Sequence, residues 1–285
     1  MLHKLSVGLK LVTLPKFQPE TFLNAVIKYR ISNLFVAPPM VLFMGTSEQV
    51  TSKHFESLRV VTSGAAPLPR ADIEKMLART KGTNVSFAQG YGMTEASPVV
   101  TLSETGSKNY ESVGCALPNI ELRVVDSEMR NLGPGKTGEL VLRGPNVMRG
   151  YRNNEAANKE VFLEGGWYRS GDIANIDESG FVYITDRLKE LIKVKGYQVP
   201  PAELENVLKE HPAVHDSAVV GMPDPVTGER PKAFVVLKPD KKIEAKDVIE
   251  FVAKRVAPYK KIKDIVFVES IPKNASGKIL RRMLK

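Results

Sequence analysis

The 285-residue sequence is poor in cysteine, tryptophan and acidic side chains. Its one cysteine, Cys115, excludes an intramolecular disulfide and is typical of a protein from a reducing compartment. No hydrophobic run reaches the roughly 20 residues that a membrane-spanning helix needs. The remaining composition, with 42% hydrophobic and 26% charged residues, is that of an ordinary globular protein. The sequence therefore predicts neither a disulfide framework nor a transmembrane segment.

Targeting signals are missing as well. Met1 does not open a secretory signal, and the last residues, Arg281 to Lys285, lack the Ser-Lys-Leu address of peroxisomal proteins. Without a secretory signal the expectation is a cytoplasmic or a peroxisomal protein, and the missing Ser-Lys-Leu address leaves the choice between the two open.

The scarcity of negative charge gives the chain a net charge of +9, and most of the excess lies in the last third. From Leu188 onward, 16 Lys and 4 Arg face 13 Asp and Glu. Such a surface attracts polyanions, but aromatic residues do not interleave with the lysines as a single-strand nucleic-acid binder requires. We therefore expect no nucleic-acid partner and favour an anionic ligand, such as the phosphates of coenzyme A. The simpler alternative is a solvated lysine-rich face.

Strand and helix patterns alternate along the first hundred residues, which predicts a parallel sheet with helices packed on it. The expected strands cover residues 9–12, 34–37, 58–62 and 85–89. One expected helix begins at Pro19, and another covers residues 69–78. Ligands of such sheets bind outside the carboxyl ends of the strands. Because residues 63–68 and 90–95 each follow an expected strand, we expect both segments to face one crevice.

Short strands at residues 121–125, 138–142 and 181–184 predict a small antiparallel β subdomain over residues 103–185. A compact α+β domain follows, with expected helices at 201–208 and around Val248 and Val252, and expected strands at 214–220, 233–237 and 265–268. The expected fold class is thus α/β. A large domain (1–186, with its α/β portion at 1–102) precedes a separate small domain (187–285), and the boundary lies near 186–189.

The segment from Gln89 to Glu95 combines two glycines, a hydroxyl and a carboxylate. Glycines let the backbone approach a ligand closely, a threonine hydroxyl can donate to a phosphate oxygen, and a glutamate can hold the magnesium ion of a nucleotide. Taken alone, the segment also fits a tight turn or a helix cap with a first-turn acid. Four further segments fit the same chemistry: Ser63-Gly64-Ala65-Ala66-Pro67-Leu68, Tyr168-Arg169-Ser170-Gly171-Asp172, residues 186–198 and residues 272–278.

In this order, the five segments resemble the adenylate-forming enzymes, and among them the 4-coumarate–CoA ligase and firefly-luciferase-like branch of acyl-CoA synthetases. The resemblance covers nearly the whole chain but only about the C-terminal half of a family enzyme. The family's Ser/Thr/Gly-rich phosphate loop lies upstream of everything present here. The missing N-terminal half is accordingly an expected partner. The alternatives are a catalytically impaired fragment that binds a nucleotide or an acyl-adenylate, and a luciferase-like monooxygenase.

The resemblance implies an ATP-dependent carboxylate–CoA ligase that acts on a small aromatic or fatty acid. In such enzymes the carboxylate attacks the α-phosphate of ATP to give an acyl-adenylate and pyrophosphate, and the thiol of coenzyme A then displaces AMP. ATP, Mg²⁺ and coenzyme A are therefore the expected cofactor and co-substrates. An adenylation domain of a non-ribosomal peptide synthetase is less similar, because those usually have proline where Met93 stands.

The resemblance also assigns roles in the first step. Thr94 contacts phosphate, Glu95 holds the metal, and Lys278 bridges the carboxylate and α-phosphate oxygens. Asp172 accepts both ribose hydroxyls, with Arg187 beside it; the plain alternatives are a turn residue and a surface ion pair. The full set implied to bind AMP or ATP is Ala66, Gln89, Gly90, Tyr91, Thr94, Asp172, Arg187, Lys189 and Lys278.

For the second step, the resemblance implies that the small domain rotates about a hinge at residues 186–189, which contains Lys189. Lys278 then leaves, Lys193 faces the adenylate, and Lys195 with Gly196 lines the coenzyme A tunnel, where a side chain at Gly196 would obstruct the thiol. The alternation of polar and apolar side chains in Lys193-Val194-Lys195 equally fits an exposed hairpin. The residues implied to line the acyl pocket are Gly64, Ala65, Pro67, Gly92, Pro98 and Val99.

Overall fold

A computed structural model describes residues 5–66, 68–274 and 277–285. The chain divides into two compact units, the first of Met1–Gly90 with Ser103–Tyr110 and the second of Tyr91–Leu102 with Glu111–Lys285. Each unit is built from two stretches that are separated in the sequence, and the chain passes from one unit to the other three times. The expected hinge at residues 186–189 lies within the second unit and stays a prediction.

The first unit is an α/β layer, as the alternating patterns predict. Its elements are α2 (Pro19–Lys28), β1 (Asn33–Val36), α3 (Pro38–Thr46), η1 (Ser52–His54), β2 (Val60–Ser63), α4 (Arg70–Ala78) and β3 (Ser86–Gly92), whose last two residues enter the second unit. β2 pairs in parallel with β1 on one side and with β3 on the other. The parallel order follows from the helices that connect successive strands.

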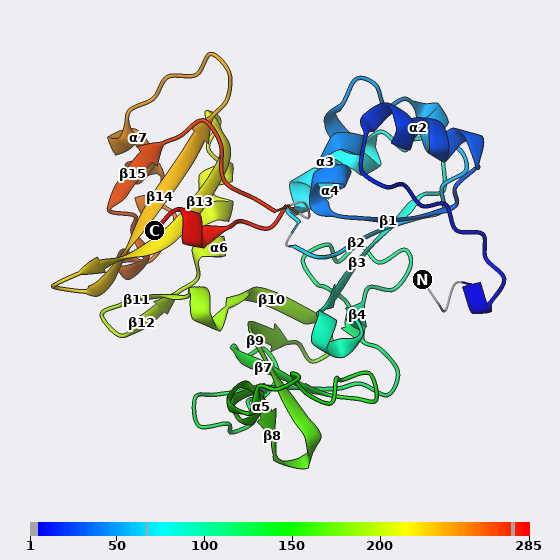
Figure 1. The fold of residues 1–285 in the computed structure, drawn as a ribbon. Coiled ribbons are helices and arrows are strands. Elements are labelled where there is room, and N and C mark those ends of the chain that lie inside the picture. The colour runs from blue at the N-terminus through cyan, green and yellow to red at the C-terminus, as the bar shows by residue number, and fades with distance from the viewer. Residues whose placement is uncertain (1–4, 67, 275–276) are drawn as a thin grey trace. The chain divides into compact units, whose positions relative to one another are not determined.

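The helices of this unit pack on one face of its strands. Successive side chains of a strand point to opposite faces, so Leu34 and Val36 of β1 lie in the core together with Phe22 of α2 and Met44 of α3. Figure 1 shows α2, α3 and α4 gathered on the same side of β1. Phe35 points to the opposite face, and 64% of its surface is exposed.

Three sequence-based expectations for this unit need correction. Residues 9–12 form no strand, and Leu9 and Leu11 are exposed, because an apolar alternation becomes a strand only where a neighbouring strand pairs with it. β3 continues to Gly92, so Gly90 lies inside the strand rather than after it. No helix was expected directly after β1, yet α3 begins there at two prolines, since proline suits the first helical turn.

The second unit begins with an antiparallel β subdomain, as expected. Its elements are η2 (Thr94–Ala96), β4 (Val99–Leu102), β5 (Cys115–Ala116), β6 (Glu121–Val125), β7 (Gly138–Arg143), α5 (Glu155–Val161), β8 (Phe162–Leu163), η3 (Glu164–Gly166), β9 (Trp167–Ile176) and β10 (Val182–Arg187). The main sheet has the order β10-β9-β7-β6, and β8 also pairs with β9. The ten-residue strand β9 carries the 168–172 motif in its centre, whereas the sequence predicted no strand there.

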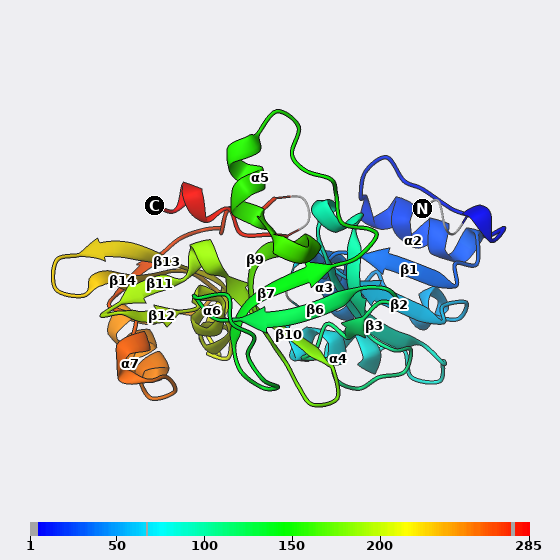
Figure 2. The ribbon, with the colours of Figure 1, turned by 90° about the horizontal axis from the view of Figure 1, so that it is seen from below.

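An α+β subdomain completes the second unit. Its elements are η4 (Leu188–Glu190), β11 (Ile192–Val194), β12 (Tyr197–Val199), α6 (Pro201–Lys209), β13 (Val214–Asp224), β14 (Gly228–Leu237), α7 (Ala245–Ala253), η5 (Pro258–Lys260), β15 (Asp264–Phe267) and η6 (Arg281–Met283). The strands form a sheet of order β12-β11-β14-β13, with β15 parallel to β14. Helices α6 and α7 share one hydrophobic core with this sheet, and Figure 2 shows both helices beside its strands. The observed elements confirm the expected α/β class.

The core under α6 gives a first testable consequence. Leu208 of α6 is completely buried, whereas Val226, between β13 and β14, is 82% exposed. We expect Leu208→Ala to lower the free energy of unfolding by about 2–5 kcal/mol, because the truncation leaves a cavity in a packed core. Val226→Ala is the control and should change it little. Urea unfolding measures both variants, and equal losses would contradict the observed core.

Candidate functional site

In the first unit, the carboxyl ends of β2 and β3 lie side by side. Ser63, the last residue of β2, is in register with Gln89 of β3. A side chain on Gly64 would bring its Cβ within 3.3 Å of the carbonyl oxygen of Gly90. The two motif segments of this unit therefore meet at one edge of the sheet, where the small residues 64–66 leave the backbone accessible.

Side chains at this edge have unequal roles. Gln89 is buried, and its amide donates to the carbonyl oxygen of Tyr110 at 2.5 Å, so the side chain holds the segment that returns to the sheet. Ser63 is 2% exposed, and its buried hydroxyl has no hydrogen-bond partner within the described residues. Ala65 has φ of +75°, an uncommon value for a residue with a side chain. Pro67 lies outside the described residues.

In the second unit, a β-bulge places Asp172. Glu139 of β7 pairs with Ile173 of β9 and Val141 pairs with Arg169, so three residues of β9 face one residue of β7. Gly171, inside this bulge, has φ of +69°. The Ser170 hydroxyl fixes the bulge because it donates to the Leu140 carbonyl at 2.6 Å and accepts from the Asp172 amide at 3.0 Å. Bulges of this kind redirect a side chain next to a binding site.

A second bulge, at Thr185 in β10, selects the partner of Asp172. Before Thr185 the register pairs Ile184 with Ala174, and after it Arg187 pairs with Asp172. Without this shift of one residue, Asp186 would stand opposite Asp172, and two carboxylates would face each other. The observed register instead places the Arg187 Nε 3.4 Å from the Asp172 Oδ1.

Asp186, which the bulge turns away from Asp172, binds two backbone amides instead. It is buried, and its two carboxylate oxygens accept from the Arg187 amide at 2.7 Å and from the Ala202 amide, in the first turn of α6, at 2.9 Å. Burial raises the pKa of the Asp186 carboxyl, and the two amide hydrogen bonds oppose that rise. The carboxylate thus joins the end of β10 to the start of α6.

Asp172 is the electrostatic centre of this region. Only 6% of the residue is exposed, and burial raises the pKa of its carboxyl. The hydrogen bond from the Tyr91 hydroxyl, at 2.5 Å, and the charges of Arg187 and Lys278 act in the opposite direction. Burial and the neighbouring Asp172 charge raise the pKa of Tyr91, so the hydroxyl stays protonated and donates.

Lys278 belongs to the same electrostatic cluster. Burial and the adjacent charge of Arg187 lower the pKa of its ammonium group, while Glu190 and Asp172 act the other way. Its backbone is fixed at both ends, since the Lys278 amide donates to the Asn274 side chain and the Asn274 amide donates to the Lys278 carbonyl, each at 2.9 Å. The structure therefore brings Lys278, Arg187 and Asp172 into mutual electrostatic reach.

Glu95 lies in a separate group with two tyrosines. Its Oε1 accepts from the Tyr151 hydroxyl at 2.8 Å, and that hydroxyl lies 3.3 Å from the Tyr168 hydroxyl. Burial raises the pKa of Tyr168. Thr94, next to Glu95 in η2, is exposed. Among the described residues no cluster of three or more His, Cys, Asp and Glu side chains could hold a metal, so Glu95 would supply a single protein ligand.

Of the acyl-pocket residues in the second unit, Pro98 and Val99 are exposed and Gly92 is in contact with Pro98. The Met93 amide donates to the Pro98 carbonyl at 2.8 Å, and a Cβ on Gly92 would overlap that same carbonyl oxygen. The turn itself therefore requires glycine at position 92.

The residues expected to serve coenzyme A lie on the hairpin of β11 and β12. Lys195 and Gly196 form its two-residue turn with φ of +50° and +83°, as a tight hairpin demands. The Lys193 amide donates to Glu229 at 2.7 Å and the Lys195 amide to Thr227 at 2.8 Å. A side chain at Gly196 would meet no atom within 4 Å, so the hairpin alternative accounts for this glycine in the observed conformation.

Lys189 is highly exposed, and its ammonium lies 3.6 Å from Glu160. This separation and exposure describe a weak surface pair.

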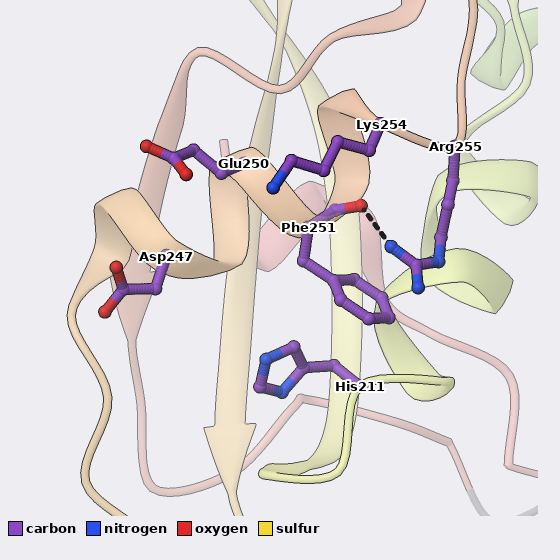
Figure 3. A pocket seen from close by; sticks show the side chains of 6 residues that line it. All are labelled: His211, Asp247, Glu250, Phe251, Lys254 and Arg255. Atoms are coloured by element: carbon purple, nitrogen blue, oxygen red, sulfur yellow. Dashed lines mark hydrogen bonds between the residues drawn. The ribbon is translucent and has the colours of Figure 1, made fainter.

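Two hollows of the described surface contain none of the predicted site residues. One, of about 380 Å³, lies beside α7 and is lined by His211, Asp247, Glu250, Phe251, Lys254 and Arg255 (Figure 3). Three of its side chains are in contact. The Arg255 guanidinium lies 3.6 Å from the centre of the Phe251 ring, and the centre of the His211 ring lies 4.7 Å from that of Phe251. The other, of about 540 Å³, includes Arg30, Arg59 and Asn84 of the first unit. No helix of the described residues is long and apolar enough to cross a membrane.

Comparison with known families decides the family of the chain. The sequence profile of AMP-binding enzymes matches residues 1–152, and that of the AMP-binding enzyme C-terminal domain matches residues 203–278. The chain belongs to the AMP-binding enzyme family. The predicted family is thereby confirmed, and with it the similarity to 4-coumarate–CoA ligases, because curated relatives carry that name.

Two curated relatives of this AMP-binding enzyme come from Arabidopsis thaliana. It is 44% identical to 4-coumarate–CoA ligase-like 9 over 287 residues, which cover 100% of this chain and 51% of the relative. It is 42% identical to peroxisomal OPC-8:0-CoA ligase 1 over 285 residues, which cover 98% of this chain and 52% of the relative. The chain thus spans about half the length of the curated relatives it matches.

Solved structures of the family superpose closely. ATP-bound MatB from Rhodopseudomonas palustris matches with a TM-score of 0.91 at 31% identity, over 99% of this chain and 55% of that one. o-Succinylbenzoate CoA synthetase (MenE) from Bacillus subtilis, in complex with the acyl-adenylate intermediate OSB-AMP, matches with a TM-score of 0.85 at 29% identity, over 100% of this chain and 57% of that one.

The structure adds residues that sequence reasoning missed. Tyr151 carries no recognisable motif, and only its contact with Glu95 singles it out. Glu190 lies inside the 186–198 motif and Arg281 just after the 272–278 motif, and both act on the Lys278 charge. The sequence offered only one indication of these two residues: they are charged and lie in or next to motif segments.

Tyr91→Phe tests the electrostatic centre. The variant leaves a buried carboxylate without one donor, so we expect the free energy of unfolding at pH 7 to fall by about 1–3 kcal/mol. The pKa of Asp172 is already raised in the folded protein, and loss of the Tyr91 bond raises it further. The penalty should therefore be largest where Asp172 is ionised and should shrink as the pH falls through the raised pKa of Asp172, above the usual carboxyl value of about 4.

Urea unfolding over a pH series measures this difference. Tyr183→Phe is the matched control, because its hydroxyl donates to Asp177 on the same sheet at 3.0 Å. A Tyr91→Phe penalty that persists unchanged at acidic pH would contradict the role given to the Asp172 charge.

Proposed function

We propose that the chain carries the adenylate-binding motifs and the mobile C-terminal domain of an ATP-dependent carboxylate–CoA ligase. One observation carries the proposal: a buried carboxylate, Asp172, accepts from Tyr91, pairs with Arg187 and lies within electrostatic reach of Lys278. In a member of the AMP-binding enzyme family, this arrangement suits a ribose that bonds to the carboxylate beside the arginine, with a phosphate near the lysine.

Asp172 has the capacity for this role. An ionised carboxylate offers about four acceptor sites, and the Tyr91 hydroxyl occupies one of them. The remaining sites can take two ribose hydroxyls, while Arg187, whose side chain is 55% exposed, closes over the sugar. Ala66, Gln89 and Gly90 would border the base and the α-phosphate mainly through their backbone.

Lys278 would act in the first step. Attack of a carboxylate on the α-phosphate crowds negative charge around phosphorus, and a positioned cation stabilises that charge most in the transition state. The ammonium is partly buried, and the charges of Arg187, Glu190 and Asp172 act on it. Thr94, exposed in η2, would donate to the phosphates.

Glu95 fits the magnesium ion that accompanies ATP. A carboxylate oxygen is a suitable ligand, and Mg²⁺ is commonly held by one or two carboxylates together with substrate phosphates and waters. The bound ion would neutralise phosphate charge. Tyr151 donates to Glu95 and so orients the carboxylate.

The second step would use the hairpin of β11 and β12. We propose that the part after residues 186–189, including Lys189, turns about that segment, so that Lys278 leaves and Lys193 approaches the adenylate. Lys195 and Gly196 would then border the coenzyme A thiol. The exposure of the Lys195–Gly196 turn, with open space around Gly196, supports this role.

The proposed substrate is an aromatic or fatty acid, bordered by Gly64, Ala65, Pro67, Gly92, Pro98 and Val99. The proposed compartment is the cytoplasm or the peroxisome, and the name of one relative, peroxisomal OPC-8:0-CoA ligase 1, supports the second.

The proposed partner is the N-terminal portion that the relatives have in addition. Within the first unit, α2, α3 and α4 pack on the face that carries Leu34 and Val36, while Phe35 on the other face is 64% exposed. Parallel sheets are normally covered on both faces. A further layer supplied by that portion would bury the second face.

The proposal predicts that pyrophosphate release depends on Lys278. We would supply the purified chain, with and without the N-terminal half of a relative, with Mg-ATP, coenzyme A and a panel of aromatic and fatty acids. Lys278→Ala should reduce release by about 100-fold or more, because a transition-state cation is lost. Thioester formation from a preformed acyl-adenylate should continue. Lys285→Ala is the control, since Lys285 is exposed at the end of the chain.

Each outcome has a meaning. Release that appears only with the added half supports both the ligase and the proposed partner. No release in either case, together with tight binding of an acyl-adenylate, would identify a binding fragment. Equal loss of both half-reactions in Lys278→Ala would contradict the separate roles proposed for the two steps.

A further inference from the structure

Arg281 of η6 is the most extensively bonded cation near the candidate site. Its Nη2 lies 2.8 Å from Glu205 of α6, its Nη1 lies 3.1 Å from Glu190 of η4, and its Nε donates to the carbonyl of Val219 in β13 at 3.2 Å. Only 13% of its side chain is exposed. One guanidinium thus joins four segments that are distant in sequence.

The contact with Glu205 makes this arrangement specific for arginine. Glu205 is 6% exposed, and its Oε1 accepts both from Arg281 and from the Val219 amide at 2.8 Å. A buried carboxylate needs such compensation. The planar guanidinium reaches two carboxylates and a carbonyl at once, whereas a lysine ammonium at the end of a flexible chain cannot reproduce that fork.

Arg281 also stands at the base of the loop that carries Lys278. In the described part of this loop (residues 272–274 and 277–280), the Leu280 amide donates to the Pro272 carbonyl at 2.8 Å and closes the base. Arg281 follows directly. Fixing its side chain on α6 and β13 therefore fixes the point from which Lys278 extends.

The pairing of Arg281 with Glu190 ties the end of this loop to a further segment. Glu190 is the last residue of η4 and directly follows the proposed hinge at residues 186–189, and its carboxylate lies 3.1 Å from the Arg281 Nη1. The position of the loop is therefore tied to the hinge segment as well as to α6 and β13.

We infer that Arg281 is a positioning residue that fastens the Lys278 loop to α6 and to η4, beside the proposed hinge. The inference rests on the proposed function, because it assigns Arg281 to the adenylation step through Lys278. A purely structural Arg281 would affect both half-reactions equally, since it would only hold α6 against β13.

The test compares Arg281→Gln and Arg281→Lys with Arg282→Gln, a control at the neighbouring exposed arginine. We expect Arg281→Gln to slow pyrophosphate release by about 100-fold, as a small misplacement of a reacting group can. Thioester formation from preformed acyl-adenylate should stay at the wild-type rate, and Arg281→Lys should fall between Arg281→Gln and wild type. Equal losses in the two half-reactions would overturn the inference.

A second measurement does not depend on activity. Hydrogen exchange of the folded variant should be faster than wild type at the amides of Lys278 and Leu280 and unchanged in α7. Unchanged exchange at these two amides would overturn the inference. Absence of Lys278-dependent release from the wild type would refute the proposed function alone, and the exchange result would still decide the role of Arg281.

If Arg281→Gln does not fold, Glu190→Gln replaces it. This variant keeps the pair of Arg281 with the buried Glu205 and removes only the charge at η4. The inference predicts slower pyrophosphate release with normal thioester formation and faster exchange at Lys278. Wild-type values in both measurements would overturn it.

Discussion

The buried charge of Asp172 is the constraint on which the candidate site depends. Removing a carboxylate from water is unfavourable unless donors and cations replace the water. Here the replacements come from separate parts of the second unit: Tyr91 at the end of β3, Arg187 at the end of β10 and Lys278 near the C-terminus. A nucleotide ribose could join this set without rearranging it, because a carboxylate has acceptor sites to spare.

Two bulges create that geometry, because each of them changes which side chains face one another across the sheet. In a sheet, a shift of one residue exchanges the side chain that faces a given neighbour. The bulge at Thr185 therefore decides whether Asp172 faces Arg187 or Asp186. Because of the same shift, Asp186 can accept a hydrogen bond from the Ala202 amide. One bulge thus places Arg187 beside Asp172 and also connects β10 to α6. A regular strand could provide neither without placing two carboxylates together.

Much of the fold could be predicted because its periodicity is local. The spacing of Leu204 and Leu208 predicted α6 to within one residue, and the alternation in β6 predicted that strand without error. Strand β9 was missed because its centre is polar and contains a bulge. The strand expected at residues 9–12 failed because pairing depends on a distant neighbour. The family resemblance singled out Asp172 and Lys278, whose roles stay predictions. It did not single out Tyr151 or Arg281, whose contacts exist only in the tertiary structure.

The glycines of the motifs show where such reasoning needs a structure. Gly92 and Gly196 were both assigned to ligand space from the sequence. In the structure, the Pro98 carbonyl excludes a side chain at Gly92, and the hairpin turn demands a positive φ at Gly196. Either residue can still border a ligand, because a backbone that turns this tightly is also an accessible one. Their glycine identity, however, follows from the chain's own geometry, so a substitution that abolishes activity at either position reports on folding before it reports on binding.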